Sequence, residues 1–295
     1  MASRQEIHLA FEKLPAMMPL YAQSLLPRRR APEDMPEMSA QVHDVTPLSG
    51  ELARYRQLCG MQASSLLPVS YPQLLAGPLH AAIVCHREFP FPAMGLVHVR
   101  NVIRMHRPCL ENLPLDLVAR VHEARPVARG HEFDLHSFAS FRGELVWEST
   151  TSVLSLKRVD PGQPHASSPA SPSAEASPNV SWDTAETVEL PPDLGRAFAA
   201  LSGDWNPIHV SAPTARLFGF PRAIIHGMWT FGRALGSMDG LLPNCPATWR
   251  VDFRRPVLLP STISIQRRIV PRGVAWRVID SESERELVAG TALQD

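Results

Sequence analysis

The feature that most constrains the fold is an internal repeat, because the chain carries the same order of short motifs twice. Three matching pairs show it: LARYRQLCGM (52–61) with GRAFAALSGD (195–204), RMHRPCL (104–110) with DFRRPVL (252–258), and GELVWEST (143–150) with RELVAGTA (285–292). Each pair is weak by itself, but the order is preserved. Self-similarity of this kind indicates two copies of one folding unit, and 295 residues allow each copy its own core.

A segment rich in proline, serine and alanine separates the two copies. Residues 159–182 read VDPGQPHASSPASPSAEASPNVSW and contain no leucine, isoleucine or phenylalanine. Such a segment buries too little apolar surface to offset its conformational entropy, which predicts a linker. We therefore divide the chain into an N-terminal extension (1–41), a first copy (42–158), a linker (159–181) and a second copy (182–295). The extension shows no diagnostic motif.

Both copies follow one plan of secondary structure. A longer helix is expected at 71–89 in the first copy and at 223–238 in the second. Alternating apolar and polar residues follow, as in LVHVRNVIRM (96–105) and ATWRVDF (247–253), and this period of two is typical of strands buried on one face. A long helix packed on a curved antiparallel sheet, twice in tandem, makes the fold class α+β.

Composition excludes several classes of function. Lysine plus arginine and aspartate plus glutamate both number 29, so the net charge is zero and nothing favours nucleic acid as a partner. The four cysteines are scattered without a CxxC pair, and the N-terminal stretch lacks the apolar run of a signal peptide. No stretch approaches the roughly 20 apolar residues of a membrane span. We therefore expect a cytoplasmic protein without a membrane span.

The string HEFDLH (131–136) has spacing that could ligate a metal. On an alternating strand, however, Glu132, Asp134 and His136 share one face and His131 lies on the other. We expect ordinary strand residues here and no metal site.

The two copies differ most at GDWNPIH (203–209). Met61 stands in the first copy where the second has Asp204, and the first copy is shorter by seven residues between this point and the helix glycine, judged by Gly77 against Gly227. A purely structural loop would not need to differ so sharply, whereas an active site built once per pair of copies would. The alternative is a polar turn that carries a hydrogen-bonded histidine.

The stretch ALSGDWNPIHVSAPTARLFGFPRAIIHGM resembles the signature of the MaoC-like dehydratases and R-specific enoyl-CoA hydratases. Together with the repeat it resembles their double hot-dog members, in which the second half keeps the catalytic loop. The departures are mild: Phe198 stands where tyrosine is frequent, and Trp205 fills the variable position. The resemblance implies a catalytic dyad of Asp204 and His209, with the backbone N–H of Gly227 as oxyanion donor.

The resemblance also implies supporting residues around that dyad. Ser202 and Asn206 are expected to hold the loop and orient the dyad or its water, and His226 to orient the substrate or simply to adjoin the helix cap. Met228 and Trp229 on the long helix are candidates for substrate binding, with core packing as the alternative for Trp229.

The implied reaction is the reversible hydration of a trans-2-enoyl thioester to the R-3-hydroxyacyl thioester. The thioester already acidifies the α-proton, so no metal or redox cofactor is implied, and the substrate itself carries CoA or the phosphopantetheine of an acyl carrier protein. Two alternatives stay open: a hot-dog acyl-CoA thioesterase and a non-catalytic module that binds acyl thioesters. A thioesterase would usually need an acidic residue on the long helix, and residues 228–238 contain none. Carrier, chain length and oligomeric state, a homodimer included, are left open.

Overall fold

The computed structural model describes residues 6–24, 27, 30–31, 34–156, 181–238 and 240–295, so almost all of the predicted linker lies outside it. The chain divides into two compact units. The first comprises Met1–Leu52, Ser65–Pro161 and Ser202–Asp204, and the second comprises Ala53–Ser64, Gly162–Leu201 and Trp205–Asp295. Each unit therefore centres on one copy of the repeat and includes a short segment from the other copy.

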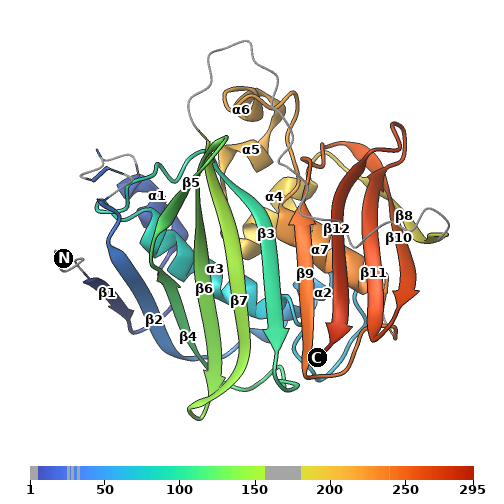
Figure 1. Ribbon diagram of the computed structural model, residues 1–295, viewed down its shortest axis with the longest axis horizontal. Coiled ribbons are helices and arrows are strands. Elements are labelled where there is room, and N and C mark those ends of the chain that lie inside the picture. The colour runs from blue at the N-terminus through green and yellow to red at the C-terminus, as the bar shows by residue number, and fades with distance from the viewer. Residues whose placement is uncertain (1–5, 25–26, 28–29, 32–33, 157–180, 239) are drawn as a thin grey trace. The chain divides into compact units, whose positions relative to one another are not determined.

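The first unit is a curved sheet around one helix (Figure 1). Its strands are β1 (Glu6–Phe11), β2 (Glu37–Val45), β3 (Leu96–Met105), β4 (Leu115–Val121), β5 (Ala124–Val127), β6 (Gly130–Phe141) and β7 (Glu144–Leu156). They follow the order β1-β2-β4-β6-β7-β3, and β5 pairs with β6. Only the β1–β2 pair is parallel among these described pairings. Helix α3 (Tyr71–Val84) packs on β2, β4 and β6, and α1 (Met17–Gln23) packs on α3.

The second unit repeats this arrangement with fewer strands. Strands β8 (Asp183–Leu190), β9 (Ala247–Phe253), β10 (Ser261–Val270), β11 (Gly273–Asp280) and β12 (Glu286–Gln294) form the antiparallel order β9-β12-β11-β10-β8. Helix α7 (Gly227–Gly236) packs on β11. The shorter helices are α4 (Leu194–Ser202), α5 (Pro207–Val210) and α6 (Ala212–Arg216), while α2 (Ser49–Cys59) crosses the division between the units.

The alternating sequence patterns form the strands that they predict. In β4, Leu115, Leu117, Ala119 and Val121 are buried while the residues between them are more exposed. The expected strands at 96–105 and 247–253 are β3 and β9, with the same limits. The mainly antiparallel sheets, with α3 packed on β2, β4 and β6 and α7 packed on β11, confirm the α+β class, and each unit is a hot dog: a helix wrapped by a curved sheet.

Both long helices are shorter than the sequence predicts. The first ends at Val84, where the N–H of Cys85 still bonds back to the Ala81 carbonyl, and Pro90 disfavours helical backbone only at Phe89. The second begins only at Gly227. Residues 223–225 are extended instead, since their backbone bonds to the segment 257–259, including a bridge between Ile224 and Leu258.

In the described part of the chain, every helix is too short or too polar to span a bilayer.

Candidate active site

The predicted catalytic carboxylate follows the end of α4, in a segment that belongs to the first unit. Gly203 has a φ of +74°, a left-handed conformation that glycine adopts without strain. The backbone N–H of Asp204 donates to Ser202 Oγ at 3.3 Å. Tyr21 Oη donates to Asp204 Oδ1 at 2.9 Å. Ser202 thus holds the backbone of this turn, and a tyrosine from the N-terminal extension holds the carboxylate.

The string NPIH builds the short helix α5 in the second unit. Asn206 is its N-cap, with its side chain accepting from the N–H of Ile208 at 3.4 Å, and Pro207 occupies the first turn, where it lacks only a hydrogen bond that helices do not make there. The N–H of His209 donates to the Asn206 carbonyl at 2.9 Å. Asn206 therefore fixes the segment that carries His209.

The imidazole of His209 is buried, with 8% of its surface exposed, and its Nδ1 lies 2.8 Å from the carbonyl oxygen of Ile224. A carbonyl can only accept, so Nδ1 carries the proton of this bond and Nε2 of the neutral ring presents a lone pair. The N–H of Ile224 in turn donates to the Ile208 carbonyl at 3.0 Å. This pair of bonds sets both the place of His209 and the tautomer that a general base needs.

His226 lies against His209 in the same unit. The two rings stack with centroids 3.7 Å apart. The ring of Phe198, on α4, has its centroid 5.0 Å from that of His226. His226 is buried and is the N-cap residue of α7, but its side chain makes no capping bond. The imidazole is therefore positioned by ring packing against Phe198 of α4 and His209 of α5, while its backbone forms the N-cap of α7.

Gly227 is the first residue of α7, where backbone N–H groups have no acceptor within the helix and the helix dipole favours negative charge. A Cβ at Gly227 would lie 2.9 Å from the ring of Phe253. Packing against Phe253 therefore favours glycine at this position, in addition to the access for substrate that the sequence suggests.

The two neighbours of Gly227 on α7 differ. Met228 is half-buried, whereas Trp229 is buried and donates from its indole N–H to the Leu58 carbonyl at 3.0 Å. Trp229 also lines a cavity of about 560 Å³ in the second unit, together with Leu58, Leu194 and Arg233. Trp229 therefore packs in the core and also lines this cavity.

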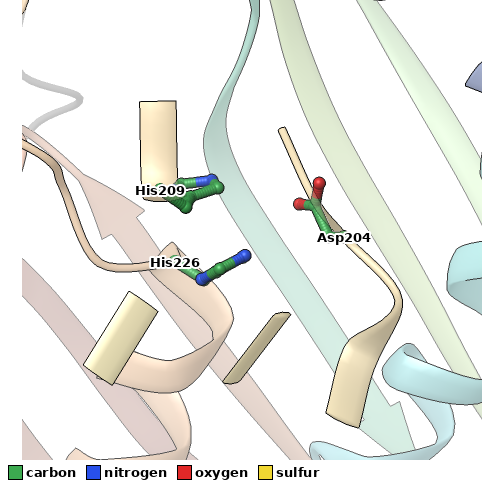
Figure 2. A group of neighbouring side chains, drawn as sticks. All are labelled: Asp204, His209 and His226. Atoms are coloured by element: carbon green, nitrogen blue, oxygen red, sulfur yellow. The ribbon is translucent and has the colours of Figure 1, made fainter. Parts of the chain in front are cut away.

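Figure 2 draws Asp204, His209 and His226 as one group on their backbone segments: the turn after α4, helix α5 and the residue before α7. One carboxylate and two imidazoles are also a donor set that metal ions accept. The string 131–136 is different, because Arg125 pairs with both Glu132 and Asp134 of β6. Its carboxylates serve a salt bridge across the β5–β6 hairpin.

Sequence reasoning missed two parts of this arrangement. Tyr21 lies 183 positions from Asp204, in a segment without a diagnostic motif. The Ile224 carbonyl is a backbone group, which every residue type has, so the sequence cannot single it out. The spacing of Met17 and Tyr21 by four residues in MMPLYAQ was the available signal, since such residues share one face of a helix.

Two hot-dog units in one chain, together with an Asp-Asn-Pro-His motif in the second copy of the repeat and a glycine at the start of helix α7, define a double hot-dog protein. The family model described as "MaoC like domain" matches residues 173–284. The 3-hydroxyacyl-thioester dehydratase X of Mycobacterium tuberculosis is 30% identical over 234 residues, which cover 79% of this chain and 81% of that protein. The chain therefore belongs to the MaoC-like dehydratase family.

Solved structures agree with this assignment. The crystal structure of HtdX from Mycobacterium tuberculosis superposes with a TM-score of 0.74 at 26% identity, covering 87% of this chain and 99% of that one. A second Mycobacterium tuberculosis protein, described as having a double hot-dog fold, covers 92% of this chain and 97% of its own with a TM-score of 0.51 at 16% identity. The first supports the family and the second the fold alone.

Proposed function

We propose that this protein catalyses the reversible hydration of a trans-2-enoyl thioester to the R-3-hydroxyacyl thioester. Membership of the MaoC-like dehydratase family makes it a hydro-lyase of acyl thioesters. The proposal adds the stereochemistry and the residues that perform the reaction. The observation that carries it is the bond between His209 Nδ1 and the Ile224 carbonyl, because this bond leaves Nε2 as a base.

In the hydration direction, Asp204 and His209 hold one water. The water oxygen forms a bond to the β-carbon while one of its protons passes to the dyad, and a proton is delivered to the α-carbon from the same face. The electron pair of the double bond moves towards the thioester carbonyl, whose oxygen gains negative charge. The backbone N–H of Gly227, assisted by the dipole of α7, stabilises that oxygen. Dehydration runs through the same steps in reverse.

The other residues act by holding this arrangement. Asn206 caps α5 and so places His209, while Ser202 bonds to the backbone of Asp204. His226 packs on the His209 ring and limits its rotation. The chemistry requires no metal or redox cofactor, because the thioester acidifies the α-proton and the substrate brings its own CoA or phosphopantetheine carrier.

The test is incubation with 2-enoyl-CoA esters of short and long chain. Loss of the enoyl absorbance with formation of the R-3-hydroxyacyl product supports the proposal. Release of free CoA would instead support a thioesterase, and binding without either change would support a non-catalytic module. Acyl carrier protein thioesters of the same chains compare the two carriers.

Variants test the residue assignment. Asp204→Asn and His209→Ala should each lower kcat by about 10²–10⁴-fold, the usual contribution of a general acid or base. Met61→Ala is the matched control, since Met61 occupies the position of Asp204 in the first copy, and it should keep the wild-type kcat. Near wild-type activity in either dyad variant would remove that residue from the mechanism.

A further inference from the structure

The N-terminal extension reaches the candidate catalytic carboxylate inside the first unit. Helix α1 supplies Tyr21, whose hydroxyl donates to Asp204 Oδ1 at 2.9 Å. Hydrogen bonds to an ionised carboxylate are charge-assisted and about twice as strong as neutral ones. Tyr21 belongs to neither copy of the repeat, so this contact is an addition to the duplicated fold.

A second contact joins the same helix to the same turn. A Cβ on Gly203 would lie 2.8 Å from Met17 Cγ, so Met17 occupies the space that a larger residue would need. Met17 and Tyr21 are four residues apart and share one face of α1. This face therefore packs directly on the Gly203–Asp204 turn at two successive positions.

The ring of Tyr21 is itself held in place. It packs on a cluster in which Leu20 of α1 meets Ala81, Ala82 and Cys85 at the end of α3. Burial, together with the charge of Asp204 and the hydrogen bond to it, raises the pKa of Tyr21 far above its ordinary value. The hydroxyl therefore stays protonated, and it remains a donor to the carboxylate at any pH at which the protein works.

The charge of Asp204 also affects the pKa of His98, a histidine of the first unit. Burial lowers the pKa of His98 to about 4, although its bond to the Arg100 carbonyl and the charge of Asp204 oppose this shift. His98 is therefore neutral near pH 7 and adds no positive charge beside the carboxylate. Tyr21 is likewise a neutral donor, and its hydrogen bond orients the carboxylate at Oδ1.

We propose that Tyr21 is a positioning residue for Asp204, so that one side chain of the N-terminal extension supports the catalytic carboxylate. This proposal rests on the proposed function for its effect on turnover. Tyr21 acts through Asp204, because its hydroxyl holds the carboxylate oxygen Oδ1 in place.

Tyr21→Phe is the decisive variant, because phenylalanine keeps the ring in its cluster and removes only the hydroxyl. Hydrogen bonds to charged groups contribute about 1.5–3 kcal/mol, so kcat for enoyl-CoA hydration should fall about 10–150-fold. KM should stay within about twofold, since substrate contacts are unchanged. Met18→Ala, an exposed residue on the same helix, is the control and should keep the wild-type kcat. An unchanged kcat in Tyr21→Phe, or a raised KM alone, overturns the proposal.

A double-mutant cycle shows whether Tyr21 acts through Asp204. In an Asp204→Asn background, Tyr21→Phe should lower kcat by less than about threefold, because the charged acceptor is already gone. A loss as large as in the wild type would place the action of Tyr21 elsewhere and overturn the proposal.

The midpoints of thermal unfolding for the same four proteins give a readout that needs no turnover. They should be non-additive if the two side chains interact, and additive midpoints refute the contact. If the wild type hydrates no enoyl thioester, the proposed function fails, while the unfolding cycle still decides whether Tyr21 holds Asp204.

Discussion

Gly195 on α4 allows the segment that carries His209 to approach closely, and replacing it with alanine tests that packing. A Cβ built on Gly195 would lie 2.2 Å from the carbonyl oxygen of His209 and 3.4 Å from a methyl group of Leu259. The first distance is far inside normal contact, and the atom it meets is backbone, which cannot rotate away. Gly195→Ala therefore has to push α4 and α5 apart, and His209 moves with them.

The expected magnitude follows from two opposing effects. Overpacking of this kind costs about 1–3 kcal/mol, while alanine in place of a helical glycine returns at most about 1 kcal/mol. With the full return from alanine, the net loss is about 0–2 kcal/mol, which corresponds to a fall in Tm of up to about 8 °C at the usual 2–4 °C for each kcal/mol. Because a misplacement of about 1 Å at a catalytic group can cost 10²-fold in rate, kcat for enoyl-CoA hydration should fall about 10–100-fold.

Gly50 provides the matched control. Like Gly195 it is the second residue of its helix, but a Cβ there would meet nothing within 4 Å. Gly50→Ala should therefore leave kcat unchanged and Tm unchanged or slightly raised. Calorimetry and the enoyl absorbance assay on both variants give the comparison. If Gly195→Ala behaves like Gly50→Ala in both measurements, the approach of α4 does not position His209 and this reasoning fails.

Two further predictions follow from the same structure. Gly227→Ala should lower the free energy of unfolding by about 1–3 kcal/mol, because its Cβ would lie 2.9 Å from the Phe253 ring. Adding Phe253→Leu should restore most of this loss, as measured by urea unfolding. If the second substitution restores nothing, the strain lies elsewhere. Burial lowers the pKa of His80 to about 3 and that of His98 to about 4. The pKa of a histidine in an unfolded chain is about 6.5, so below about pH 6.5 the unfolded state binds more protons than the folded state. Stability should then be complete above about pH 6.5 and fall towards pH 4 by up to about 1.4 kcal/mol for each pH unit and histidine; His80→Gln should flatten this slope, and an unchanged slope would contradict the assignment.

The sequence by itself determined the elements and the motif. Alternation in 96–105 and 247–253 predicted two strands with the limits that the structure has, because the faces of a strand depend on neighbouring residues alone. The comparison of the two copies singled out GDWNPIH in the same local way. The helix limits were less accurate, since the extended backbone of 223–225 depends on its pairing with 257–259.

Only the tertiary structure decided how the site is held. The tautomer of His209 is set by a carbonyl 15 residues away, the carboxylate of Asp204 by a hydroxyl 183 residues away, and the approach of α5 by the missing side chain of Gly195. None of these partners has a fixed spacing from the residue it serves, and one of them is a backbone atom that every residue type possesses. Residue order encodes the local conformation of each segment, whereas contacts between distant segments exist only once the chain has folded and buried them.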